Sequence, residues 1–313
     1  MFNKKFLALS LALVLTVGAV FSFTPQAGAF FGWFSSSNDD AEQGYVQVRG
    51  SDTMVNIGQS LAEAFMAQSE HEISVTGGGS GTGVAALINN EVDIANVSRG
   101  MRDSEVEQAA ANGVDVYRGV IAMDGLAVVV NENNPVQDLT FDEIAAIFRG
   151  EITNWAEIGG PNMDITLYGR QSNSGTFVYF RENVLGDDYS DAKNRMNGNA
   201  QIVEGVRADR SSIGYVGIGY ATEGGQERSG LGVVNVAVDS NSEYASPLVP
   251  ENVATGAYPL ARPLNNYFNG QPTGAVLEFI EFIVSEEGQE VAVDAGFYPV
   301  SPEFQSVNEE LLN

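Results

Sequence analysis

Three short segments rich in glycine and hydroxyl side chains hold the residues of this chain best suited to bind a ligand. They are Gly50-Ser51-Asp52-Thr53-Met54, the run Gly-Gly-Gly-Ser-Gly-Thr-Gly at 77–83, and Arg170-Gln171-Ser172-Asn173-Ser174-Gly175-Thr176. Glycine lets an anion approach the backbone, and serine and threonine hydroxyls add hydrogen-bond donors. One such segment alone is typical of ordinary turns and helix caps. Three of them, one beginning with Arg170, predict a site for a tetrahedral oxyanion.

The position of each segment strengthens this prediction, because each follows an expected strand and begins an expected helix. At such a junction the first N–H groups of the helix lack partners within the helix, and its positive end faces the ligand. A second cation, Arg99, follows Ser98 at the end of another expected strand. The junctions therefore provide anion-binding chemistry in a chain that is acidic overall.

Nucleotide-binding and catalytic motifs do not fit the spacing of these segments. The chain has no G-x-x-x-x-G-K-S/T, and Thr82 stands where G-x-G-x-x-G and G-x-S-x-G around Ser80 would need glycine. Cysteine is absent, and His71 is the one histidine. The absence of cysteine excludes disulfides and thiolate metal sites, and a single histidine nearly excludes histidine-based catalysis. We expect no enzyme, no metal and no cofactor.

The charge balance excludes other classes of partner. Forty-one acidic residues against 15 basic ones give a net charge of −26, which repels nucleic-acid phosphates and anionic lipids. Acidic pairs such as Asp187-Asp188 indicate a solvated face rather than a site. The same surface charge is typical of halophilic proteins and also of any very soluble protein, and the sequence leaves these two interpretations open.

The first 29 residues have the pattern of a secretory signal peptide. Lys4 and Lys5 precede an apolar run from Phe6 to Phe23, and Ala27-Gly28-Ala29 offers a small-x-small cleavage site. We expect cleavage near Ala29 and a free periplasmic protein with a charge of 13 − 41 = −28. A retained membrane anchor is the alternative, since the run approaches spanning length. Residues 30–44 are expected to be a leader tail or linker.

Strands and helices alternate after residue 44, which predicts an α/β fold, and the length predicts two lobes. The expected strands are Tyr45–Arg49, Glu72–Thr76, Asp93–Val97, Val120–Met123, Leu126–Val130, Ile165–Tyr168 and Ile213–Tyr220, with an extended segment at Ala257–Phe268. The expected helices are Val55–Gln68, Val84–Asn89, Ser104–Ala111, Thr140–Arg149, Gly175–Val184, Gly274–Val284 and Gln289–Asp294. Thr140 and Glu143 have the spacing of a capping box.

From about Val46 to Pro302 the chain resembles the periplasmic phosphate-binding proteins of high-affinity phosphate ABC transporters. The resemblance rests on GSDTM (50–54), GGGSGTG-VAALIN (77–89), VDIANVSR (92–99), DGLAVVVN (124–131), F-x-G-x-I-T-N-W (148–155), R-x-x-x-SGT (170–176) and YPLARPL (258–264). It implies a type II periplasmic binding fold, with two α/β lobes joined by two crossing strands and phosphate enclosed between the lobes. It further implies a monomeric receptor that delivers phosphate to a membrane permease.

We expect the crossing segments near Asp124–Asn131 and Ala257–Arg262, because each is an apolar extended stretch between elements of the two lobes. The expected lobes are then residues 45–126 with 260–313, and residues 127–259. The resemblance implies that the residues holding the anion are Thr53, the Met54 N–H, Ser80, Gly81, Arg170, Ser174, Gly175 and Thr176. We expect Ser98 to be a further contact from the first lobe. Arg99 is a further candidate, either for contact with phosphate or for orienting Asp52.

The chain departs from the family pattern at Ser98, where some members have an aspartate that accepts the proton of phosphate. Asp52 is the nearest substitute, and the alternative is that Asp52 caps its own helix. Other functions stay open: a receptor for sulfate or molybdate, a secreted phosphatase-like enzyme, or a phosphate sensor that feeds no transporter.

Overall fold

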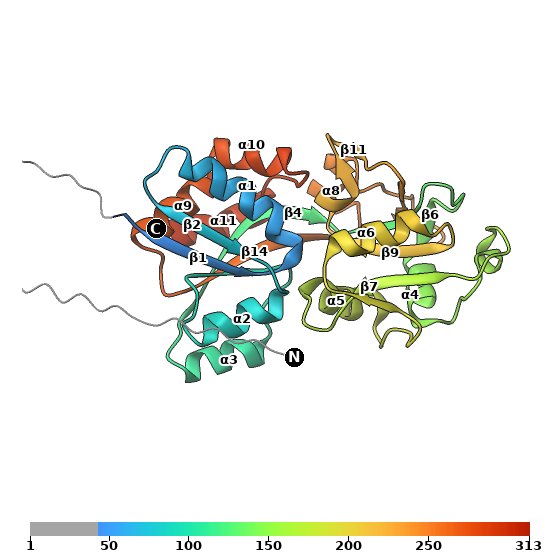
Figure 1. Ribbon diagram of the computed structural model, residues 1–313, viewed down its shortest axis with the longest axis horizontal. Coiled ribbons are helices and arrows are strands. Elements are labelled where there is room, and N and C mark those ends of the chain that lie inside the picture. Colours follow the sequence, from blue (N-terminus) through green and yellow to red (C-terminus); the bar gives the residue numbers. More distant parts are fainter. Residues whose placement is uncertain (1–42) are drawn as a thin grey trace, which may run out of the picture. The chain divides into compact units, whose positions relative to one another are not determined.

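Two five-stranded sheets form the framework of the computed structural model, which describes residues 43–313 (Figure 1). The first sheet has the strand order β2-β1-β3-β14-β4. Its strands are β1 (Tyr45–Gly50), β2 (Glu72–Thr76), β3 (Ile94–Val97), β4 (Val116–Gly125) and β14 (Ala261–Asn269). The expected signal peptide and residues 30–42 of the expected linker lie outside the described residues.

The first sheet is mixed, and this lets the two ends of the described chain meet in it. Strand β1 pairs in parallel with β2 and β3, whereas β14 runs antiparallel to both β3 and β4. In Figure 1 this sheet and its helices accordingly combine blue to green segments with orange to red ones, from the two ends of the colour bar. These helices are α1 (Val55–Met66), α2 (Ser80–Ile88), α3 (Asp103–Ala111), α9 (Gly274–Val284), α10 (Glu286–Asp294) and α11 (Pro302–Leu312).

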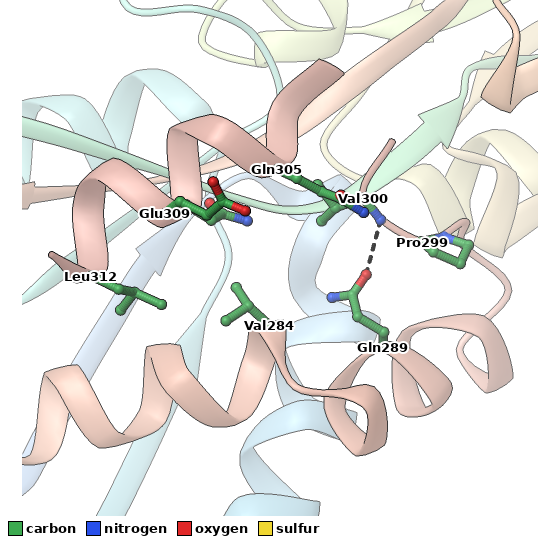
Figure 2. Close-up of a pocket in the computed structure, with 8 residues that line it drawn as sticks. Val284, Gln289, Pro299, Val300, Gln305, Glu309 and Leu312 are labelled. Atoms are coloured by element: carbon green, nitrogen blue, oxygen red, sulfur yellow. Dashed lines mark hydrogen bonds between the residues drawn. The ribbon is translucent and has the colours of Figure 1, made fainter. Parts of the chain in front are cut away.

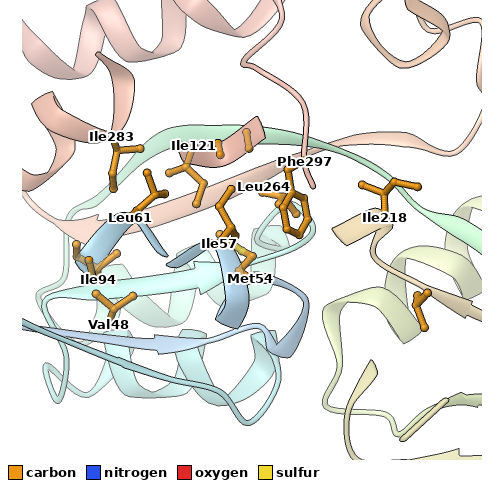
Figure 3. Packing of buried hydrophobic residues seen from close by; sticks show 14 of the residues in the cluster. Val48, Met54, Ile57, Leu61, Ile94, Ile121, Ile218, Leu264, Ile283 and Phe297 are labelled. Atoms are coloured by element: carbon orange, nitrogen blue, oxygen red, sulfur yellow. The ribbon is translucent and has the colours of Figure 1, made fainter. Parts of the chain in front are cut away.

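The core beside this sheet forms because α1 places apolar residues on one face. Ile57 and Leu61, four residues apart, lie on the same side of the helix and are fully buried. They belong to one cluster with the strand residues Val48 and Ile94 and with Ile283 of α9 (Figure 3). Burial of each such side chain contributes about 1.5–3 kcal/mol to stability. This packing fixes the start of α1, and therefore the first glycine–hydroxyl segment, against the sheet.

The second sheet has the order β12-β5-β9-β7-β8. Its strands are β5 (Ala127–Asn131), β7 (Thr166–Arg170), β8 (Asn194–Met196), β9 (Ser212–Val216) and β12 (Leu231–Val233). Helices α4 (Phe141–Arg149), α5 (Gly175–Phe180) and α6 (Asn199–Ala208) accompany it (Figure 1). Aromatic rings fill its core, where Phe180 stacks on Tyr215 with centroids 4.3 Å apart.

Shorter elements complete the described chain. They are the 3₁₀ helices η1 (Asp52–Met54) and η2 (Trp155–Ile158), the π-helical turn η3 (Arg181–Leu185), strands β6 (Asp138–Thr140), β10 (Thr222–Glu223), β11 (Gln226–Glu227) and β13 (Asn235–Ala237), and helices α7 (Ile218–Ala221) and α8 (Pro250–Ala254). Across residues 43–313, no helix has both the length and the apolar character needed to cross a bilayer.

The α/β prediction and the capping box are confirmed. Thr140 precedes α4, its side chain accepts from the N–H of Glu143, and the Glu143 carboxylate accepts from the N–H of Thr140. Most expected elements are present, with ends that differ by a few residues. The expected helix Gly175–Val184 is shorter, since α5 ends at Phe180 and the chain continues in η3.

Two expected extended segments are wrong in part. The expected strand Ile213–Tyr220 ends at Val216, because the Ile218 N–H turns to bind the carboxylate of Asp124 and begins α7. Residues 257–260 are not extended, since the Ala261 N–H closes a turn on the carbonyl of Tyr258. Helices α6 and α11 were not expected from the sequence at all.

Candidate functional site

A cluster of buried polar side chains forms where the three glycine–hydroxyl segments meet. The Gly79 N–H donates to the Gly50 carbonyl at 2.8 Å, and the Gly81 N–H donates to the Asn173 carbonyl at 3.0 Å. The segments from both sheets are therefore in contact. The buried polar cluster, each member at most 2 % exposed, comprises Ser51, Thr53, Ser80, Ser98, Asp124, Arg170, Ser174, Thr176, Asn199 and Arg262. Burial of so many polar groups is costly unless each finds a partner or a ligand.

Hydroxyl groups line this cluster from both sheets. Thr53 Oγ1 lies 2.8 Å from Thr176 Oγ1. Ser51 Oγ donates to Ser98 Oγ at 2.8 Å, and Ser98 Oγ lies 3.3 Å from Ser80 Oγ. A hydroxyl can rotate to donate or to accept, so this set can reorganise around the oxygens of an anion.

The close approach of the third segment depends on a glycine. A Cβ added at Gly175 would lie 2.1 Å from Ser80 Oγ and 2.9 Å from Ser98 Oγ. No side chain can occupy that space while the serines stay in place. Gly175 is thus the residue that lets the start of α5 come next to the serines that follow β2 and β3.

We expect Gly175→Ala to weaken ligand binding by about tenfold or more, because the added methyl group pushes the start of α5 away from Ser80 and Ser98. Titration calorimetry of the purified variant measures the change. Gly100→Ala is the matched control, since a Cβ at Gly100 meets nothing within 4 Å. Wild-type affinity in Gly175→Ala would show that this close approach is not needed for binding.

Arg170 provides the cation expected from the sequence. It ends β7 and is 1 % exposed. Its Nη1 donates to Asp52 Oδ1 at 3.2 Å and its Nη2 to the Asn197 carbonyl at 2.9 Å. Its Nε has no hydrogen-bond partner among the residues that the structure describes. Burial lowers the pKa of Arg170 and Asp52 opposes that shift, but a guanidinium stays protonated at neutral pH. A buried donor without a partner is what an anionic ligand would satisfy.

The carboxylate of Asp52 makes contacts that its sequence position did not suggest. Its Oδ1 accepts from the N–H of Asn199 at 2.7 Å and from Asn199 Nδ2 at 2.6 Å, in addition to Arg170. Asn199 is the first residue of α6. The prediction that Asp52 caps its own helix is therefore wrong, because the carboxylate caps a helix of the second sheet instead. This contact also fixes the direction of the Arg170 guanidinium.

Sequence reasoning missed the second buried cation of the cluster, Arg262. Its Nε and Nη2 donate to Asp124 Oδ2 at 3.0 and 2.8 Å, with exposed side-chain fractions of 1 % and 0 %. Its remaining donors reach the carbonyl of Ser98 at 2.9 Å and Thr176 Oγ1 at 3.0 Å. Arg262 and Asp124 face each other in the β14–β4 register. Both lie in motifs quoted above, YPLARPL and DGLAVVVN, but no local signal joins them.

Three groups that were expected to contact the ligand make hydrogen bonds within the protein. Arg99 makes two 2.7 Å hydrogen bonds to the carboxylate of Glu105 and none to Asp52, while its Nε, like that of Arg170, has no partner in residues 43–313. The Met54 N–H donates to the Ser51 carbonyl at 3.1 Å, and the Gly81 N–H is bound to Asn173 as described above. The expectation that these groups hold the ligand is not supported by their geometry. The structure does bring together Thr53, Ser80, Ser98, Gly175 and Thr176, and it connects Arg170 to Thr53 through Asp52 and Asn199. Ser174 Oγ accepts from the N–H of Phe177 in its own helix.

A separate cavity of about 280 Å³ lies among α9, α10 and α11 (Figure 2). Val284 and Leu312 form apolar parts of its wall, and the Val300 N–H donates to Gln289 Oε1 at 2.9 Å. None of its lining residues belongs to the buried polar cluster. We therefore assign the candidate site to the cluster. No group of three or more histidines or carboxylates that could hold a metal ion occurs within residues 43–313.

Comparison with known proteins gives consistent relatives. A family model described as the PBP superfamily domain matches residues 35–287. Protein SphX of Synechococcus elongatus is 34 % identical over 88 % of this chain and 83 % of its own length. The phosphate-binding protein PstS of Bacillus subtilis is 31 % identical over 85 % of this chain and 84 % of its own length.

Solved structures agree with these sequence relatives. An ABC-type phosphate transport receptor from Vibrio cholerae superposes with a TM-score of 0.65 at 27 % identity, covering 82 % of this chain and all of that one. A structure with bound phosphate from Clostridium perfringens has a TM-score of 0.72 at 29 % identity, with the same coverage. The two-lobed binding-protein fold implied by the sequence motifs is thereby confirmed.

Proposed function

The chain belongs to the PBP superfamily, and on that premise we propose that it is an extracytoplasmic receptor that binds inorganic phosphate and delivers it to an ABC permease. The observation that carries this proposal is the buried polar cluster, in which Arg170 has an Nε without a partner in residues 43–313 and is connected to Thr53 through Asp52 and Asn199. The curated relative from Bacillus subtilis, named a phosphate-binding protein, supports the choice of anion. The expected leader at 1–29 supports export of the chain.

We propose that phosphate contacts the hydroxyls of Thr53, Ser80, Ser98, Ser174 and Thr176, the N–H of Gly175 and the guanidinium of Arg170. Two of the five Arg170 donors already hold Asp52 and Asn197, which leaves Nε and further N–H groups for two phosphate oxygens. Arg262 acts one step further out, since it binds Thr176 and the carbonyl of Ser98.

We also propose that the lobes are residues 45–126 with 260–313, and residues 127–259. Strand β4 ends at Gly125, β5 begins at Ala127 and β14 begins at Ala261, so the chain passes between the two sheets at these points. The ligand groups come from both sheets, so phosphate favours the arrangement in which both sets contact it. The proposed crossing segments are Asp124–Asn131 and Ala257–Arg262.

Isothermal titration of the purified protein with phosphate and with sulfate tests this function. We expect saturable phosphate binding and sulfate binding at least a hundredfold weaker, since a carboxylate near the anion accepts a proton that sulfate lacks. Equal or tighter binding of sulfate or molybdate would assign the site to another oxyanion. Turnover of a phosphate ester by the same preparation would instead favour an enzyme.

Asp52→Asn separates two roles of Asp52 in selectivity. The Oδ1 atom of Asp52 holds Arg170 and Asn199, and its Oδ2 has capacity to accept the proton of phosphate. If Oδ2 accepts that proton, the phosphate-to-sulfate affinity ratio should fall by about tenfold or more, because an amide can donate to sulfate. We expect this fall in competition titrations.

If Asp52 only orients Arg170, phosphate and sulfate binding should weaken in parallel and the ratio should stay constant. That outcome would mean that a group other than Asp52 accepts the proton of phosphate. Asp188→Asn is the matched control, because the Asp188 side chain is 88 % exposed. It removes the same charge without touching the cluster.

A further inference from the structure

Lys193 is a buried cation that the proposed site does not yet use. It is the only lysine after residue 5, and it is 4 % exposed. Its Nζ donates to the carbonyl of Arg170 at 3.3 Å. The same Nζ lies 3.3 Å from the ring centroid of Tyr189 and 4.3 Å from that of Phe177. An ammonium this close to aromatic rings is held by cation–π attraction. This single charge is therefore directed at the backbone of Arg170.

The surroundings of Lys193 are built to hold the backbone of Arg170 from both sides. The Arg170 N–H donates to Tyr215 Oη at 3.2 Å, while Lys193 binds the Arg170 carbonyl. Tyr189 Oη donates to Tyr215 Oη at 2.9 Å and so connects the two contacts. A Cβ at Gly169 would lie 2.8 Å from Lys193 Cδ and 3.0 Å from Tyr215 Oη. Only glycine at 169 leaves room for both side chains.

We propose that Lys193 is a positioning residue for phosphate: its ammonium fixes the Arg170 main chain so that the guanidinium points at the anion. The inference rests on the proposed function, since it concerns the cation assigned to phosphate. Lys193 acts through Arg170 and does not itself contact the ligand. Phe177, which holds the ammonium, directly follows Thr176, so the same contacts connect α5 to the end of β7.

The charge of Lys193 depends on pH in an accessible range. Burial lowers the pKa of Lys193 to about 7, and the nearby cation Arg195 adds to this shift. The titratable and charged groups that face it are Tyr189, Tyr215, Arg170 and Arg195. Burial raises the pKa of Tyr215 to about 12 and that of Tyr189 well above its ordinary value, so both stay neutral near pH 7. Lys193 forms no ion pair with a carboxylate in residues 43–313.

The test compares wild type with Lys193→Met, which keeps an unbranched apolar chain and removes the ammonium. At pH 6 we expect phosphate affinity to fall by about tenfold. By pH 9 the ratio of the two affinities should approach one, because wild-type Lys193 has lost its proton. Taking the ratio at each pH cancels the titration of phosphate itself. Arg195→Met, which removes a neighbouring cation, is the control and should leave affinity within threefold.

The stability of wild type relative to Lys193→Met should rise with pH, whereas its advantage in phosphate affinity should fall with pH. The opposite directions separate a positioning role of Lys193 from a merely structural one. The folded pKa of Lys193 lies below the unfolded one, so the unfolded chain binds more protons between pH 7 and about 10.5. The stability of wild type relative to Lys193→Met should therefore rise with pH over this window. Affinity that follows stability, or a pH-independent affinity ratio, would overturn the proposal.

A measurement on the wild type alone covers the case in which the variant does not fold. Lysine side-chain labelling gives a signal from Lys193 that NMR can follow, since no other lysine lies after residue 5. Phosphate should raise the pKa of Lys193, because the bound anion stabilises its charge and orders Arg170. If the pKa of Lys193 does not change in a sample that binds phosphate, the positioning role of Lys193 is refuted and the proposed function still stands. A wild-type protein that does not bind phosphate would refute the proposed function.

Discussion

Arg170→Ala is expected to weaken phosphate binding by about two to three orders of magnitude. The guanidinium is 1 % exposed and its Nε has no partner in residues 43–313, so phosphate would supply the acceptor that this donor lacks. Removal of one member of a buried charge pair costs about 3–5 kcal/mol, which corresponds to this loss of affinity. Titration calorimetry with phosphate measures it, and a thermal melt establishes that the variant is folded.

Arg99→Ala is the informative companion to this variant. Arg99 is also a buried arginine close to the cluster in sequence, but its guanidinium is bound to Glu105. We expect phosphate affinity within threefold of wild type, with some loss of stability from the broken ion pair. An affinity loss in Arg99→Ala as large as that in Arg170→Ala would return Arg99 to the site. A loss below threefold in Arg170→Ala would remove Arg170 from it.

The largest effect on stability is expected from Asp124→Asn. Asp124 binds Arg262 with Oδ2 and accepts the Ile218 N–H with Oδ1, and its side chain is 0 % exposed. The substitution leaves the Arg262 charge buried without a carboxylate, which costs about 3–5 kcal/mol. Urea unfolding should show a lower midpoint at an unchanged slope. The additional change Arg262→Met should recover part of the loss, because the unpaired charge is then gone.

An exposed ion pair provides the comparison. Arg102 and Glu182 lie 2.8 Å apart with side chains 42 % and 45 % exposed. Glu182→Gln should change the free energy of unfolding by only about 0–1 kcal/mol, since water screens the pair. If Asp124→Asn costs no more than Glu182→Gln, the buried Asp124–Arg262 pair does not stabilise the fold more than an exposed pair does.

The sequence by itself determined which segments form the site. Glycines, hydroxyl residues and Arg170 stand directly at the ends of strands and the starts of helices, so local backbone chemistry is enough to place the three segments at the same kind of junction. The capping box of α4 was predictable for the same reason, because its two residues are three positions apart. Signals of this kind act over a few residues and are visible without a fold.

Tertiary structure decided which charged groups pair. Asp52 binds Asn199 across 147 positions, and Asp124 binds Arg262 across 138. Helix α6 was missed because part of its N-terminal cap comes from Asp52 rather than from the preceding residues. Arg99, next to a site residue in sequence, bonds instead to a glutamate six positions away. The choice of partner depends on distance and burial, because Coulomb attraction and desolvation act between groups that are neighbours in the fold. No local sequence pattern specifies which groups become such neighbours.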